Sequence, residues 1–228
     1  MKHIYSISAS PGNTGERYYN HVFKKMGLEY HYRALQIKQI TPDIVTLLRE
    51  MSVGFSVSMP LKSQIIPYLD DMSDEVFDYG SCNTVLMMGD QMCGFNTDIY
   101  GIKHVLTDVG SDCVAILGDG AMSKMFQRIL GRQATVYSRS NSNWEERHSK
   151  HDVVINCTPL GMNNDTPLDK IQSSIVIDLV IGKTQLETQC AEAGVKYIPG
   201  IEFYREQFLK QFLLYTGIVI SKEDIKEL

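Results

Sequence analysis

Two side chains of complementary chemistry, Lys62 and Asp98, each follow an apolar run in the first half of the chain. Lys62 closes the stretch SVSMPLK and Asp98 closes the stretch GFNTD. A lysine beside a carboxylate can donate and accept a proton during a reaction on a small molecule. Asn83, in GSCNT, and Ser58 could supply hydrogen bonds to the same molecule. From spacing alone, a solvated loop residue remains the commoner interpretation of each of the four.

A glycine-rich turn in AILGDGAMS is the second candidate site. Gly118 allows a tight turn, Gly120 lets the backbone approach a pyrophosphate, and the following helix offers free N–H groups at its start. Arg139 lies about 20 residues further on, where a dinucleotide-binding fold places the residue that contacts the adenosine ribose. An arginine flanked by Ser138 and Ser140 favours the 2′-phosphate of NADP over NAD. The alternative is an ordinary surface arginine.

Composition describes an ordinary globular chain of 228 residues, of which 43% are hydrophobic and 21% charged. The net charge of −5 gives no basic field for nucleic acid. The start of the chain turns polar at once and the apolar stretches are strand-sized, so we expect no signal segment and no membrane span. Five cysteines without a C-x-x-C pair favour reduced thiols in the cytoplasm and argue against disulfides and zinc. Cys82, Cys113 and Cys157 lie in apolar runs and are expected in the core.

Apolar runs alternate with helix-like segments, which predicts an α/β chain with parallel sheets. A boundary is expected near residue 100, with a first domain at 1–100 and a shortened, Rossmann-like dinucleotide-binding domain at 101–202. The last helical segment, within 203–228, is expected to fold back on the first domain. A substrate cleft is expected between the two domains. The main strands of the first domain are expected at 3–9, 30–35 and 53–59, and its helices at 16–28 and 42–51.

Several motifs together resemble the shikimate dehydrogenase family. Residues 56–62 are similar to the family pattern N-V-T-x-P-x-K, residues 81–84 to A-V-N-T, and G-[YF]-N-T-D is intact at 94–98. In the second half, DVVINCTPLGM resembles a family strand that ends N-A-T-P-x-G-M, and VIDLVIGKTQL resembles V-x-D-x-x-Y-x-P-x-x-T-x-L. PGIEFYREQFLKQFLLYTG is similar to the closing segment, in which Gly200 leads to Gln207. The resemblance covers nearly the whole chain, with the motifs in the family's order.

This resemblance implies NADP-dependent, reversible reduction of 3-dehydroshikimate to shikimate, a step of chorismate and aromatic amino acid biosynthesis. It implies that Lys62 is the acid/base and Asp98 its partner, that Asn83 and Gln207 bind substrate hydroxyls, and that Ser58 stands in for a family threonine. It implies a small-molecule substrate, no metal, no nucleic acid, no membrane, and a monomer or homodimer. The residues that it assigns to NADP are Gly118, Asp119, Gly120, Ala121, Ser138, Arg139, Ser140, Thr158, Leu179 and Gly200.

The turn before the first predicted helix, SASPGNTGERYYN, decides where a substrate carboxylate would bind. The family has S-x-S-P ahead of a helix with N-x-x-F, which residues 20–23 match. Counting back without a gap places the two serines at Asn13 and Gly15, with Thr14 between them. Ser8–Pro11 matches the letters better but requires a five-residue insertion. We therefore predict Asn13 and Thr14 as the carboxylate-binding turn, and the earlier serines as the strand end.

The sequence departs from the family at several positions. Ile181 replaces a tyrosine, and Asp119 and Met122 replace small residues of the glycine-rich turn. The stretch between Arg139 and Thr158 is shorter than in the family, which predicts a thinner wall around the adenine. Two alternatives therefore stay open: a sibling dehydrogenase acting on quinate or an amino-substituted analogue, and a relative that binds a ligand without turnover.

Overall fold

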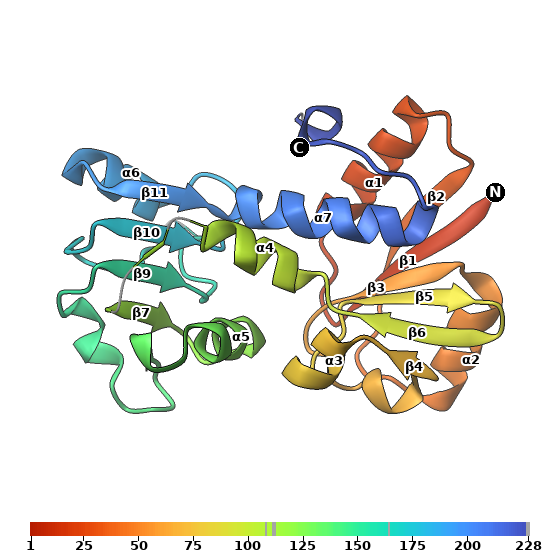
Figure 1. The fold of residues 1–228 in the computed structure, drawn as a ribbon, viewed down its shortest axis with the longest axis horizontal. Coiled ribbons are helices and arrows are strands. Elements are labelled where there is room, and N and C mark those ends of the chain that lie inside the picture. The colour runs from red at the N-terminus through yellow and green to blue at the C-terminus, as the bar shows by residue number, and fades with distance from the viewer. Residues whose placement is uncertain (108, 111–112, 164, 227–228) are drawn as a thin grey trace. The chain divides into compact units, whose positions relative to one another are not determined.

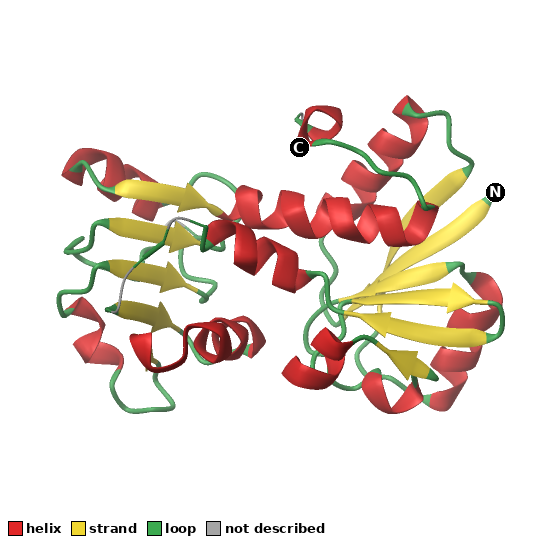
Figure 2. Cartoon of the chain, viewed as in Figure 1, coloured by secondary structure: helices red, strands yellow, loops and turns green. Residues whose placement is uncertain are grey.

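The computed structural model describes residues 1–107, 109–110, 113–163 and 165–226. The chain forms two compact units, one of Met1–Ile99 with Gln207–Leu228 and the other of Tyr100–Glu206 (Figure 1). The predicted α/β fold is confirmed, since each unit contains one sheet with helices packed against it (Figure 2). The last two residues of the predicted C-terminal segment, 227 and 228, lie outside the described residues.

The first unit contains a six-stranded mixed sheet in the order β2-β1-β3-β5-β6-β4. The expectation of a purely parallel sheet is wrong here, because β5 runs antiparallel to both β3 and β6. A short turn at Gly89 joins β5 to β6, with the positive φ of 63° that tight hairpin turns require. The strands are β1 (Lys2–Ser8), β2 (Tyr30–Gln36), β3 (Gly54–Val57), β4 (Asp71–Met72), β5 (Thr84–Met88) and β6 (Gln91–Phe95).

Helices of the first unit form where the sequence offers caps and an apolar face. Helix α2 (Pro42–Met51) begins after Thr41, whose hydroxyl accepts a hydrogen bond from the N–H of Ile44, and proline fits its first turn. Helix α1 (Thr14–Lys25) lays Tyr19 on the ring of Tyr32, with ring centroids 4.2 Å apart. The other helices are α3 (Asp74–Tyr79), the short turns η1 (Ile66–Tyr68) and η4 (Lys222–Ile225), and the C-terminal part of α7 (Gly200–Thr216).

The second unit contains a five-stranded, wholly parallel sheet in the order β11-β10-β9-β7-β8. Parallel strands place all their carboxyl ends at one edge, which is where ligands bind in such sheets. The strands are β7 (Val114–Leu117), β8 (Ala134–Tyr137), β9 (Val153–Asn156), β10 (Ile175–Asp178) and β11 (Lys196–Pro199), the last of which the sequence patterns did not predict. The helices are α4 (Asp98–Val105), which starts in the first unit, α5 (Ala121–Leu130), α6 (Gln185–Ala193), and the short turns η2 (Gly131–Gln133) and η3 (Trp144–His148).

The cysteines correct one expectation about the core. Cys82 is buried and Cys157 partly buried, but Cys113 is exposed because it lies just before the first residue of β7. Burial raises the pKa of the Cys82 thiol to about 12 and raises that of Cys157 further above its ordinary value. Both thiols therefore stay protonated at neutral pH, which disfavours nucleophilic chemistry at either. No helix among the described residues is long and apolar enough to cross a membrane.

Candidate active site

Lys62 and Asp98 form an ion pair in the first unit. Lys62 lies in the segment after β3, and Asp98 is the first residue of α4. The lysine Nζ donates to Oδ2 of the aspartate over 2.6 Å. The two side chains are 16% and 4% exposed, so the pair is largely withdrawn from water while the ammonium group keeps some access. The structure thus brings together two residues that are 36 positions apart in the sequence.

Asn83 holds the second oxygen of the same carboxylate. Its Nδ2 donates to Oδ1 of Asp98 over 2.8 Å, and its Oδ1 accepts from the backbone N–H of Thr97 over 2.8 Å. Asn83 and Asp98 are each only 3% exposed. Because each carboxylate oxygen accepts a hydrogen bond, the side chain of Asp98 is fixed in orientation between Lys62 and Asn83.

The hydrogen-bonded array continues into residues that the sequence patterns did not single out. The hydroxyl of Thr84 donates to Oδ1 of Asn83 over 2.7 Å. Gln211 of α7 donates to that hydroxyl over 2.6 Å and accepts from the hydroxyl of Tyr19 over 2.6 Å. Gln211 lies one helical turn beyond Gln207 and therefore on the same helix face, which is the only signal the sequence carries for it.

The other predicted substrate residues of the first unit lie outside this array. Ser58 is exposed at the end of β3, Gln207 is half-buried on α7, Asn13 is exposed at the N-cap of α1, and Thr14 is half-buried in the first turn of that helix. Among the described residues, none of these four side chains forms a hydrogen bond. Their polar atoms therefore keep the capacity to bind a ligand, and their roles stay predictions.

Of the two early serines, only Ser8 belongs to the end of the first strand, and the choice of the ungapped register stays a prediction. Strand β1 ends at Ser8, which is 5% exposed, and Ser10 follows in the exposed turn. The hydroxyl oxygen of Ser8 is buried and has no hydrogen-bond partner among the described residues. A buried strand end of this kind is poorly placed to hold a soluble carboxylate.

The glycine-rich turn of the second unit fits the pyrophosphate of a dinucleotide. Gly118 has a φ of +96°, and a Cβ there would lie 3.1 Å from Cγ2 of Thr158. Around Gly120, the N-cap of α5, an added Cβ would meet nothing within 4 Å, and no side chain caps the helix from that position. The backbone is therefore open to an anion at the helix start. Ser123, at the place of the usual third glycine, donates to the carbonyl of Gly118 over 2.6 Å and steadies the turn.

The predicted ribose-binding residues follow β8. Ser138 is buried, and its hydroxyl lies 2.9 Å from that of Ser140. Ser140 also donates a hydrogen bond to Oδ2 of Asp119. Arg139 is exposed and, among the described residues, has no ion-pair partner. The structure thus places Ser138–Ser140 beside the glycine-rich turn, as β7 and β8 are paired neighbours in the sheet.

The remaining predicted cofactor residues lie at the ends of β9 and β10. Thr158 donates to Oδ1 of Asn156 over 2.6 Å. Leu179 packs against the start of α7, where a Cβ on Gly200 would lie 2.7 Å from the backbone of Leu179. Only glycine fits that position without a shift of the backbone. Asp178, fully buried, accepts hydrogen bonds from Asn156 and other donors and fixes this edge of the sheet.

Sequence comparison decides the family of this chain. The family model described as "Shikimate dehydrogenase substrate binding domain" matches residues 6–85. The shikimate dehydrogenase (NADP(+)) of Staphylococcus epidermidis is 30% identical over 90% of this chain and 87% of its own length. This chain belongs to the shikimate dehydrogenase family. The family enzyme of Bacillus subtilis is 27% identical over 95% of this chain and 92% of its own length.

Solved structures of the shikimate dehydrogenase family share the fold. Shikimate 5-dehydrogenase of Thermus thermophilus, described in complex with NADP(H) and shikimate, has a TM-score of 0.84 at 22% identity and covers 100% of this chain and 98% of its own. A chorismate mutase/shikimate 5-dehydrogenase fusion protein of Clostridium acetobutylicum has a TM-score of 0.86 at 22% identity, over 99% of this chain and 94% of its own. The second unit accordingly has the Rossmann-like fold expected of a family member.

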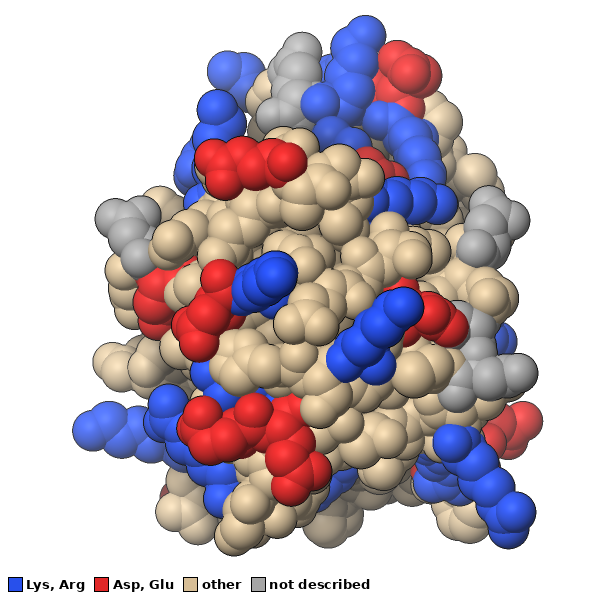
Figure 3. All heavy atoms as spheres, turned by 90° about the vertical axis from the view of Figure 1, so that its left-hand side faces the viewer, with Lys and Arg blue, Asp and Glu red and all other residues tan. Residues whose placement is uncertain are grey.

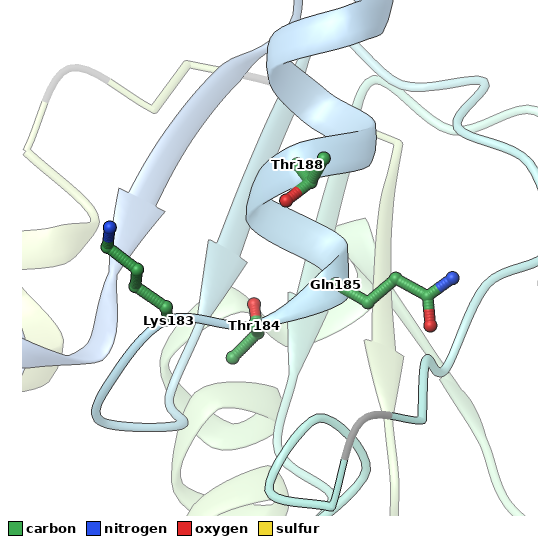
Figure 4. A pocket seen from close by; sticks show the side chains of 4 residues that line it. All are labelled: Lys183, Thr184, Gln185 and Thr188. Carbon is green, nitrogen blue, oxygen red and sulfur yellow. The ribbon is translucent and has the colours of Figure 1, made fainter.

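A shallow pocket in the second unit lies away from the predicted residues. It has a volume of about 370 Å³ and is lined by Lys183, Thr184, Gln185 and Thr188 at the start of α6 (Figure 4). The hydroxyl of Thr184 is already engaged by Asp178, so it is not a free donor for a ligand. The face in Figure 3 carries side chains of both signs spread among uncharged ones. Such a surface offers no single-sign field for a polyanion.

Proposed function

We propose that this chain catalyses the NADP-dependent, reversible reduction of 3-dehydroshikimate to shikimate, within chorismate and aromatic amino acid biosynthesis. The observation that carries the proposal is the buried array in which Asp98 is held between Lys62 and Asn83. Relatives named shikimate dehydrogenase (NADP(+)) along most of the chain support it. So does the Thermus thermophilus structure, described with NADP(H) and shikimate.

Lys62 serves as the acid and base of the reaction. When a ring carbonyl becomes a hydroxyl, its oxygen must gain a proton, and the reverse reaction must remove that proton. The ammonium group of Lys62 donates it at Nζ and the neutral amine takes it back. Asp98 orients Nζ through the 2.6 Å contact. A bound nicotinamide supplies the hydride for the reduction.

The substrate is held by neutral polar groups of the first unit. Gln207 binds a ring hydroxyl and Ser58 adds a further hydroxyl contact. Asn83 binds a second ring hydroxyl in exchange for the hydrogen bond that its Nδ2 donates to the hydroxyl of Thr97. Asn13 and Thr14 bind the carboxylate at the start of α1, where unpaired backbone N–H groups favour an anion. Holding the ring at several points orients the reacting oxygen toward Lys62.

The second unit binds the dinucleotide. Its pyrophosphate is held by the backbone from Gly118 to Ala121, whose open cradle supports this assignment. Arg139, with Ser138 and Ser140, contacts the adenosine ribose and its 2′-phosphate. Thr158 and Leu179 lie where the neighbouring strands β9 and β10 end. Gly200, which has no side chain, lets the start of α7 lie directly against the backbone of Leu179.

A direct spectrophotometric assay tests the proposal. Oxidation of NADPH is followed at its absorbance band after 3-dehydroshikimate is added, and the reverse reaction is run with shikimate and NADP. Lys62→Ala should lower kcat by about 100-fold or more, because it removes the acid and base. Lys38→Ala, at an exposed lysine of the same unit, should leave kcat within about twofold. Unchanged turnover in Lys62→Ala would contradict the proposed mechanism, and no turnover in the unmodified protein would contradict the function.

A sibling activity on quinate or an amino-substituted ring acid is the second candidate. Ile181, at the place of a family tyrosine, is 43% exposed and offers no hydroxyl to a ligand. A panel of ring acids assayed with NADP and with NAD separates this candidate from the first. Calorimetric titration with both dinucleotides separates it from a relative that binds without turnover. We propose a monomer or homodimer as the working assembly.

A further inference from the structure

The carboxylate of Asp119 lies beside Ser140, one of the residues that the proposed function assigns to the 2′-phosphate. Asp119 stands between Gly118 and Gly120 in the glycine-rich turn and is exposed. Its Oδ2 accepts the hydroxyl of Ser140, which follows β8. Strands β7 and β8 pair in parallel, with Leu117 opposite Tyr137, so the turns that follow them lie at one edge of the sheet. The contact between the two turns is therefore set by the sheet.

The hydroxyls beside Arg139 are already engaged within the protein. Ser138 and Ser140 lie 2.9 Å apart, and the hydroxyl of Ser138 also accepts the backbone N–H of Asn141. Asp119 then accepts Ser140 from the other side. A phosphate bound by Arg139 and Ser140 would have to displace this carboxylate and remain close to its negative charge. Two like charges in such proximity repel each other even near a protein surface.

The same carboxylate can accept a ribose that lacks the phosphate. In dinucleotide-binding folds, an acidic side chain at this edge hydrogen-bonds the free 2′-hydroxyl of NAD. Asp119 reaches the edge from the turn after β7 rather than from the end of β8. Arg139 and Asp119 therefore act on the ribose in opposite senses: the arginine favours a 2′-phosphate and the aspartate disfavours it.

We propose that Asp119 is a specificity-determining residue that opposes the 2′-phosphate and narrows the preference of this chain for NADP over NAD. The inference rests on the proposed function, because it concerns the dinucleotide site of the second unit. It names a determinant within the glycine-rich turn itself, which the spacing of Arg139 does not reveal.

Titration calorimetry on the full chain tests the assignment without turnover. The probes are 2′,5′-ADP and 5′-AMP, which differ only in the 2′-phosphate, followed by NADP and NAD. Asp119→Asn keeps an acceptor for Ser140 and removes the charge, so the Kd for 2′,5′-ADP should fall about tenfold. The Kd for 5′-AMP should stay unchanged or rise. Glu192→Gln, at an exposed residue of α6 next to the opposite edge strand β11, is the matched control and should change neither value.

Each outcome bears on one claim. A tighter Kd for the 2′-phosphorylated probe alone, repeated with NADP against NAD, supports the proposal. An equal change for both probes assigns Asp119 to the 5′-phosphate that they share and overturns the proposal, as does no change for either. If neither the unmodified protein nor Asp119→Asn binds any of the four probes, the proposed function fails together with this inference. Circular dichroism of the variant checks that the fold is kept.

Discussion

The two units hold their candidate residues in opposite ways. In the first unit, Asp98 and Asn83 are each 3% exposed and are fixed by several hydrogen bonds within the protein. In the second, Asp119, Arg139 and Ser140 are exposed on turns at a sheet edge. Proton transfer tolerates little error in geometry, whereas cofactor choice depends on charges that can be exchanged on a turn. We therefore expect substitutions in the first unit to have large effects on kcat or on stability. Substitutions in the second unit should change cofactor preference with little effect on stability.

The largest expected effect tests whether the buried array acts in the reaction. Asp98→Asn removes the charge beside Lys62 while keeping the size of the side chain. We expect kcat to fall about 100-fold to 10,000-fold, because the lysine loses the carboxylate that orients its Nζ. Steady-state kinetics with shikimate and NADP measure it. Asp90→Asn, on the exposed turn between β5 and β6, is the control and should stay within about twofold. A fall in kcat of less than threefold in Asp98→Asn would contradict a role of the buried array in the reaction.

A smaller effect compares the loss of buried hydrogen bonds in the first unit with the loss of an exposed one in the second. Gln211→Leu leaves the hydroxyls of Tyr19 and Thr84 without their buried partner and should lower the free energy of unfolding by about 2–4 kcal/mol. Ser140→Ala breaks the exposed bond to Asp119 and should change it by less than about 0.5 kcal/mol. Denaturant titration followed by circular dichroism measures both. Equal costs for the two variants would remove the contrast between the units.

The smallest expected effect is the alkaline sensitivity of the first unit. Burial raises the pKa of Tyr32 to about 12 from its ordinary value near 10, although its hydroxyl donates to Ser56 over 2.6 Å. The folded chain thus keeps a proton that the unfolded chain releases. The retained proton contributes about 2–3 kcal/mol to the free energy of unfolding. That contribution is fully present below about pH 10 and is lost as pH rises to about 12.

Between about pH 10 and 12, the free energy of unfolding should fall less steeply with pH in Tyr32→Phe. The change in slope should correspond to close to one fewer proton released on unfolding. Burial also raises the pKa of Tyr215, which shares Ser56, so part of the alkaline sensitivity remains. Unfolding free energies measured from pH 8 to 12 test this. Tyr18→Phe, at a partly exposed position of α1, should leave the slope unchanged. The same slope in all three proteins would refute a buried, protonated Tyr32.

Much of the local structure was predictable because it follows from local patterns. The proline and threonine at the start of α2 mark its first turn, and the glycine-rich turn falls between β7 and α5 as expected. The antiparallel pairing of β5 with β3 was not predictable from apolar runs, because alternation of side chains gives no strand direction. Its pairing with β6 does have a local signal, the Gly89-Asp90 pair typical of a hairpin turn. The strand β11 escaped for another reason: it is an edge strand of sequence KYIP with no fully buried residue, so it lacks the apolar run of the central strands.

The sequence by itself determined the residue types of the site, its order of motifs and, through them, the family. Only the tertiary structure decided which of those residues meet. Gln211 and Thr84 are 127 positions apart, and no local pattern links them. Asp119 and Ser140 become partners because β7 and β8 pair in register, which places two turns at one edge. Local propensity acts within a few residues, whereas contacts between distant segments are fixed by the packing of the whole unit.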